Sequence, residues 1–307
     1  MRRTQDRRST PFFHVTIAIV LILPFLIVLP SPRAGSPYPD LRDSLDPELQ
    51  MRLEGVLADL GLVPATERKE LCVALADITD LKRPRVAAVN GDHMVYAASL
   101  PKLAILLAAF KEVEAGRMAL DAETRQALTD MIRTSSNEAA SEMLRRVGPQ
   151  KVADILQAPE FRLYDPSGKG GLWVGKAYGK AEAWKRDPIH NLSHGATALQ
   201  AARFYYLLET NQLVSPELSR EMKAILADPE IHHKFVKGLA SRQGIRIYRK
   251  SGTWKKWHAD SAMVESSAHK YIVVGLTAHP EGGQWLERLI APLHDLIMDD
   301  PSRCQPH

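Results

Sequence analysis

The sequence predicts an α+β fold in which strands from both ends of the chain complete one antiparallel sheet around an inserted all-helical lobe. Strand-like runs rich in β-branched and small apolar residues occupy 70–91 and 244–279. Between them, 121–156 and 193–228 carry apolar residues at helical spacing. Because the strands lie near the two ends and the helices between them, one sheet shared by both ends is the expected architecture.

Length and composition indicate one domain, or two interleaved lobes, with a sizeable core. The chain has 307 residues, of which 45% are hydrophobic. Its net charge is +4, and the positive residues are scattered apart from one cluster at 249–256. Because no nucleic-acid-binding motif accompanies them, we expect no nucleic-acid partner.

The N-terminus has the pattern of an export segment. Four arginines precede an apolar run from Phe12 to Pro30, which is close to the length that spans a bilayer. The residues around Ala34 fit a cleavage site poorly, so we expect 1–35 to be an uncleaved anchor rather than a cleaved signal. Arginines keep their end in the cytoplasm, which places the body of the protein in the periplasm, held at the inner membrane. The remaining predicted divisions are a linker at 36–45, a folded domain at 46–300 and a polar tail at 301–307.

Capping and turn residues predict the elements in order. Asp46 is a good N-cap for a helix that ends at Gly61, and two strands around a turn follow at 70–79 and 83–91. A helix begins after Ser99, and Gly148-Pro149 divides the helical stretch that comes next. After a glycine-rich loop at 164–191, Ser193 is the expected cap of a further helix. Three strands and a helix close the chain, at 244–253, 257–266, 270–279 and 282–300.

The sequence gives no sign of a cofactor, a metal centre or a disulfide framework. It has two cysteines, of which Cys72 lies in a strand-like run and is expected to be a small buried hydrophobe, whereas Cys304 lies in the tail. The histidine pairs at 190 and 194 and at 232 and 233 lack the companion ligands of a zinc site. We therefore expect no cofactor and no metal.

The first motif is Ser99 followed three residues later by Lys102, at the start of an apolar helix. One interpretation is an ordinary helix start, with serine as the N-cap and Lys102 at the surface. However, the first two turns have almost no polar face, and a helix that is apolar all round is buried. A buried lysine either pairs or loses its proton, and a neutral amine beside a serine is one way to activate a nucleophile.

Two further motifs lie downstream. Ser135, Ser136 and Asn137 interrupt a helical pattern, either as a capped junction or as a proton-relaying serine and a substrate-binding amide. The segment Lys250–Thr253 ends a strand, either as a plain edge or as an ammonium and hydroxyls beside a glycine that a substrate can approach closely.

In this order, S-x-x-K, S-x-N and K-[ST]-G resemble the motif set of penicillin-binding proteins and class A β-lactamases. The resemblance covers roughly Asp46 to Asp299 and implies their fold, an antiparallel sheet with an inserted helical lobe. It implies that Ser99 is the acylated nucleophile, Lys102 its base and Ser135 the proton donor to the leaving nitrogen. It also implies an oxyanion hole formed by the Ser99 and Thr253 backbone N–H groups. The expected substrate-binding residues are Asn137, Lys250, Ser251, Gly252 and Thr253.

The sequence departs from the class A pattern in three ways. Ser136 stands where an aspartate is usual, and the short spacing between Ser99 and Ser135 predicts a more open cleft. The E-x-x-L-N loop that carries the deacylating glutamate is missing. In the corresponding segment Glu182 is a candidate base or a solvated loop residue, and Asp187 is the other carboxylate.

These observations lead to three functional hypotheses. The first is an exported serine hydrolase that opens β-lactam-type amides through a Ser99 acyl-enzyme. The second is a D-alanyl-D-alanine peptidase acting on peptidoglycan stem peptides, since such enzymes share the motifs and also lack the glutamate. The third is a binding or sensing protein that is acylated by β-lactams and deacylates slowly. In each case the partner is a small-molecule β-lactam or a cell-wall peptide.

Overall fold

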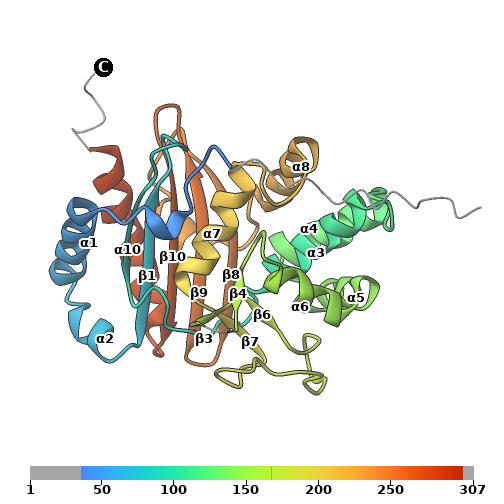
Figure 1. Ribbon diagram of the computed structural model, residues 1–307. Coiled ribbons are helices and arrows are strands. Elements are labelled where there is room, and N and C mark those ends of the chain that lie inside the picture. The colour runs from blue at the N-terminus through green and yellow to red at the C-terminus, as the bar shows by residue number, and fades with distance from the viewer. Residues whose placement is uncertain (1–35, 167, 300–307) are drawn as a thin grey trace, which may run out of the picture. The chain divides into compact units, whose positions relative to one another are not determined.

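A five-stranded antiparallel sheet organises the molecule, and both ends of the described chain contribute to it (Figure 1). The computed structural model describes residues 36–166 and 168–299. The strands lie in the order β2-β1-β10-β9-β8, so that β1 pairs with β10 from Leu71 opposite Thr277 to Asp77 opposite Tyr271. Their bounds are β1 (Leu71–Asp77), β2 (Arg85–Val89), β8 (Arg246–Trp254), β9 (Trp257–Glu265) and β10 (Lys270–Ala278). The predicted fold class is confirmed.

The side chains of the sheet alternate between two cores. Leu71, Val73 and Leu75 of β1 pack in the core that also contains apolar residues of α1 and α10. Cys72, Ala74 and Ala76 lie in the other core, which extends into the helical lobe. The helices beside the first core are α1 (Pro47–Asp59), α2 (Val63–Glu67), α9 (Phe235–Gly238) and α10 (Gly282–Met298).

A lobe of helices lies against the other side of the sheet (Figure 1). Gly148 adopts φ +91° and ends α5, and Pro149 begins α6, as the sequence predicts. Helix α7 packs directly on β1 and β10, between the sheet and the rest of the lobe. The bounds are α3 (Lys102–Glu114), α4 (Ala122–Arg133), α5 (Asn137–Val147), α6 (Pro149–Gln157), α7 (Ala198–Glu209) and α8 (Pro216–Leu226).

The helix predicted to start at Ser193 starts later. Thr197 is its N-cap, and the residues before it form β7 (His194–Ala196). This strand pairs with β3 (Val95–Tyr96) and β6 (Trp173–Val174), which are distant in sequence, and that pairing overrides the local helical pattern. Two short strands, β4 (Tyr164–Asp165) and β5 (Gly170–Gly171), pair within the loop.

The segment interpreted as a linker belongs to the folded domain. Leu41, in a 3-10 turn at Leu41–Asp43, is buried, and Asp40 forms an ion pair with Arg203 of α7 at 2.8 Å. The predicted anchor at 1–35, the tail at 301–307 and Cys304 lie outside the described residues. In 36–166 and 168–299, every helix is too short or too polar to cross a bilayer.

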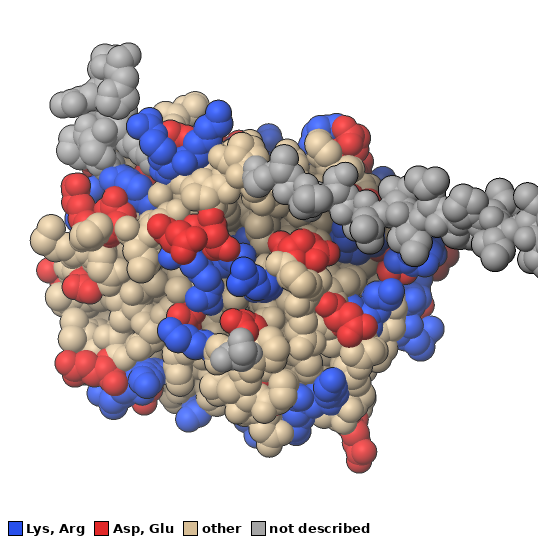
Figure 2. Space-filling view, viewed as in Figure 1, with Lys and Arg blue, Asp and Glu red and all other residues tan. Residues whose placement is uncertain are grey.

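Charges and metal ligands agree with a plain surface. Figure 2 shows Lys and Arg interspersed with Asp and Glu on the face that it displays. Within the described ranges, no three His, Cys, Asp or Glu side chains are grouped so that they could hold a metal ion. Cys72 is buried, and burial raises the pKa of its thiol to about 12, so it is a small hydrophobe rather than a reactive thiol.

Candidate active site

Ser99 lies in the turn between β3 and α3. Ala98, the residue before it, has φ +49°, a left-handed conformation that is unfavourable for any residue except glycine. The N-cap of α3 is Pro101, and no side chain caps the helix. Because Ser99 is not the N-cap, its hydroxyl is not used in helix capping, and its side chain lines a cavity.

The end of strand β8 lies directly against this turn, and a glycine makes that contact possible. A Cβ atom on Gly252 would lie 2.3 Å from the Ala97 carbonyl oxygen and 2.7 Å from the Ser99 backbone nitrogen. These distances are too short for any side chain. The Gly252 backbone is therefore packed beside the Ser99 N–H, one of the two donors expected to form the oxyanion hole.

Lys102 is fully buried behind Ser99. Its amine bonds to the Ser135 carbonyl oxygen at 2.6 Å, the Ser136 carbonyl oxygen at 3.1 Å and Asn137 Oδ1 at 2.9 Å, and it lies 3.3 Å from Ser135 Oγ. All four partners are neutral oxygens, so no opposite charge offsets the cost of burial. Burial lowers the pKa of Lys102 to about 7, which leaves a substantial neutral fraction at neutral pH. The structure directs this amine at the second motif rather than at a hydrogen bond with Ser99.

Ser135 lies between two lysine amines. Its Oγ is 2.9 Å from Lys250 Nζ and 3.3 Å from Lys102 Nζ, and its backbone has φ +61° at the junction of α4 and α5. Lys250 is buried, and its pKa is well below the usual value because of burial and the nearby charge of Lys102. One hydroxyl thus joins two amines that readily lose protons, an arrangement suited to moving a proton.

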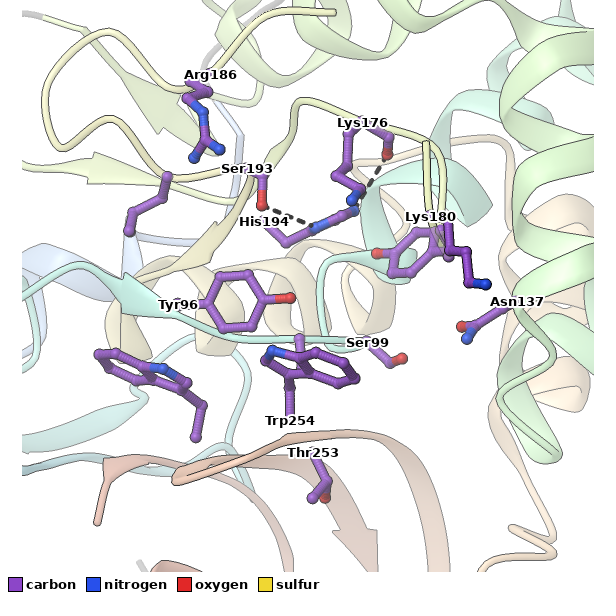
Figure 3. A pocket seen from close by; sticks show the side chains of 15 residues that line it. Tyr96, Ser99, Asn137, Lys176, Lys180, Arg186, Ser193, His194, Thr253 and Trp254 are labelled. Carbon is purple, nitrogen blue, oxygen red and sulfur yellow. Dashed lines mark hydrogen bonds between the residues drawn. The ribbon is translucent and has the colours of Figure 1, made fainter. Parts of the chain in front are cut away.

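The rest of the second motif has a clear division of roles. Ser136 caps α5, since its hydroxyl accepts a bond from the Ala139 N–H at 3.1 Å. The Asn137 carbonyl oxygen is bonded to Lys102, which leaves its amide NH₂ as a donor toward the cavity that it lines. Figure 3 shows Asn137 and Ser99 on the same side of this cavity.

The cavity has a volume of about 540 Å³. Its lining combines aromatic rings of β3 and of the β8–β9 turn with polar and basic side chains of the loop before β7 (Figure 3). None of the described residues that line it is an aspartate or a glutamate. The lining residues are Tyr96, Ala98, Ser99, Asn137, Lys176, Tyr178, Gly179, Lys180, Arg186, Leu192, Ser193, His194, Thr253, Trp254 and Trp257.

The structure does not bring Glu182 to the cavity. It is exposed and is absent from the lining, so its placement is that of a solvated loop residue. Asp187 is buried, and its two oxygens accept bonds from the Tyr164 hydroxyl and from three backbone N–H groups of residues 189–192. The two carboxylates of this loop therefore serve solvation and loop folding.

Two residues of the site have no motif that could reveal them in the sequence. Lys234 is buried, and its amine bonds to the Gly252 carbonyl oxygen at 2.7 Å and to Thr253 Oγ1 at 2.8 Å. Burial lowers its pKa to about 8. It is held in place by the buried pair of Arg249 and Asp260, since Asp260 also accepts a bond from the Phe235 N–H.

His194 is the second such residue. Its Nε2–H donates to the Lys176 carbonyl oxygen at 3.1 Å, and its ring stacks on Tyr178 with 4.3 Å between centroids. Burial lowers the pKa of the ring to about 4, so His194 is neutral at neutral pH. The Tyr178 ring in turn lies 4.5 Å from Lys102 Nζ, which closes the lysine off from solvent.

The fold and this serine–lysine–serine arrangement define an active-site serine protein of the acyl-transfer type. A family model described as the beta-lactamase enzyme family matches residues 65–125 and 122–299. The chain belongs to this family, and the resemblance noted in the sequence is confirmed.

Solved structures share the fold at low sequence identity. A β-lactamase from Sphaerobacter thermophilus DSM 20745 is 18% identical, with a TM-score of 0.59 over 80% of this chain and 96% of that one. PBP-A is 16% identical, with a TM-score of 0.60 over 82% and 98%. A mutant of the class A β-lactamase of the last common ancestor of Gram-negative bacteria is 19% identical, with a TM-score of 0.61 over 78% and 96%. No curated protein matches the sequence.

Proposed function

We propose that this protein opens β-lactam-type amides, with Ser99 as the nucleophile that becomes acylated. The observation that carries the proposal is the buried network in which Ser135 Oγ is 3.3 Å from Lys102 Nζ and 2.9 Å from Lys250 Nζ. A buried lysine with a lowered pKa and no carboxylate partner is costly to keep and is typical of a catalytic base.

Acylation then proceeds in two proton transfers. Neutral Lys102 takes the Ser99 proton while Oγ bonds to the amide carbonyl carbon, and the backbone N–H groups of Ser99 and Thr253 stabilise the oxyanion. As the C–N bond breaks, Ser135 donates its proton to the leaving nitrogen and takes one from Lys102. The substrate's carboxylate binds at Lys250, Ser251 and Thr253, and its charge favours the protonated form of Lys250.

A second candidate function is supported by the cavity lining. Hydrolysis of the acyl-enzyme needs a base for water, and no described lining residue is a carboxylate. We therefore propose slow deacylation, as expected of a D-alanyl-D-alanine peptidase presented with a β-lactam, or of a protein that binds β-lactams and stays acylated. PBP-A, which shares the fold, has been solved as an acyl-enzyme complex with penicillin G.

Labelling with a fluorescent penicillin tests the assignment of the nucleophile. The wild-type domain is expected to become covalently labelled, and Ser99→Ala is expected to abolish labelling. Ser193→Ala is the matched control, because Ser193 is the other serine that lines the cavity. Labelling that survives in Ser99→Ala would show that another residue is acylated.

A further inference from the structure

The loop side of the cavity carries three basic side chains. Lys176, Lys180 and Arg186 all line it. Figure 3 shows Ser99 between Thr253, at the end of β8, and the loop residues Lys176 and Arg186, while Lys180 extends toward Asn137. The nucleophile thus has cationic groups on two sides, those of the motif strand and those of the loop.

These three cations have no acidic partner within 36–166 and 168–299. Arg186 donates one bond to the Asn191 carbonyl oxygen at 3.1 Å, and none of the three takes part in an ion pair in those ranges. Elsewhere the domain pairs its lysines, as with Lys169 and Asp92 at 2.8 Å or Lys223 and Glu209 at 2.7 Å. Since the lining also lacks Asp and Glu, the positive potential of the loop is directed into the cavity.

The position of Ser135 shows which part of a substrate would meet the loop. Ser135, the proposed donor to the leaving nitrogen, is bonded to Lys250, so the leaving part and its carboxylate lie on the β8 side. The acyl part then extends toward Asn137 and the loop. We propose that the preferred substrates are dianionic amides, which carry a second carboxylate on the acyl side chain that Lys176, Lys180 and Arg186 recognise.

This inference rests on the proposed function, because it needs acylation of Ser99 as its readout. The three cations are partly or fully exposed, so water and salt screen them, and the expected preference is moderate, about tenfold in the rate of acylation. The preference should shrink at high salt, since the Debye length falls from about 8 Å at 0.15 M to about 3 Å at 1 M.

Three penicillins that differ in one substituent on the acyl side chain test the proposal. Benzylpenicillin carries hydrogen at that carbon, carbenicillin a carboxylate and ampicillin an ammonium. The second-order rate constants for acylation, followed by intact mass at low salt, should fall in the order carbenicillin, benzylpenicillin, ampicillin. If all three acylate Ser99 at rates within about twofold, the inference fails while the proposed function stands. If none acylates Ser99, both fail.

Charge removal provides the second arm. The triple variant Lys176→Gln, Lys180→Gln, Arg186→Gln should lose most of the ratio between carbenicillin and benzylpenicillin. Lys82→Gln, an exposed lysine in the turn between β1 and β2 that does not line the cavity, should keep it. A ratio that persists in the triple variant, or that is unchanged at 1 M salt, would overturn the assignment of the loop cations.

Discussion

Lys102 is the residue on which the proposed chemistry depends most. It is buried with four oxygen partners and no carboxylate, so its proton is lost near neutral pH rather than near pH 10. A base must be deprotonated to accept the Ser99 proton, and its usable fraction therefore rises with pH up to its pKa.

The pH dependence of acylation follows from that pKa. The second-order rate constant should rise about tenfold per pH unit below pH 7 and level off above it, because the pKa of Lys102 is lowered to about 7. Lys102→Ala should lose about 10²–10⁴ of the rate across the range. Rapid-mixing measurements with benzylpenicillin from pH 5.5 to 9 give this profile. A rate independent of pH in the wild type would rule out Lys102 as the titrating base.

At the same scale, the sequence predicted the reacting residues but not their supports. Ser99, Lys102, Ser135 and Lys250 come from motifs whose spacing is set by the fold, and the structure brings all four into one network. Lys234 has no motif, because it reaches Thr253 Oγ1 through a tertiary contact anchored by a buried ion pair. The position of Glu182 likewise depends on the course of an irregular loop, which local patterns do not specify.

At the scale of elements, the contact between β8 and the turn before α3 sets the geometry of the oxyanion hole. Gly252→Ala would place a methyl group against backbone atoms of Ala97 and Ser99, which cannot move aside as a side chain can. Acylation should fall about 10²–10³-fold, the cost of a lost oxyanion donor. The free energy of unfolding should fall by about 1–3 kcal/mol because the strand must shift.

Gly55→Ala is the control for this prediction. Gly55 lies within α1, and a methyl group added there would have nothing within 4 Å, so alanine should raise the free energy of unfolding by about 0.5–1 kcal/mol. Acylation should be unchanged. Urea unfolding and acylation kinetics on both variants provide the comparison, and normal acylation by Gly252→Ala would contradict the role given to the strand contact.

For the whole molecule, patterning predicted the sheet, the helical lobe and their order along the chain. The reason is physical, since alternation on β1 separates two cores and each predicted strand has an apolar face to bury. The prediction was wrong at Ser193, where pairing of β7 with two distant strands replaces a helix start. It was also wrong for 37–45, because the ion pair of Asp40 with Arg203 and the burial of Leu41 depend on tertiary contacts.

The complete cavity, rather than any one residue, determines how long the acyl-enzyme lasts. Its described lining has no carboxylate, and Glu182 lies outside it, so Glu182→Gln should leave the lifetime of the adduct unchanged. Intact mass followed over time in both proteins measures that lifetime. A longer-lived adduct in the variant would identify Glu182 as the base that activates water.

The most direct test of the account is the time course of intact mass after mixing the wild-type domain with benzylpenicillin. We predict a burst in which one penicillin adds per molecule, followed by turnover slower than acylation by about 10²–10⁴-fold, the usual contribution of a positioned base. The adduct should be absent from Ser99→Ala. Rapid turnover with no burst and no detectable adduct would contradict the account, because it would require a water-activating group that the cavity does not hold among its described residues.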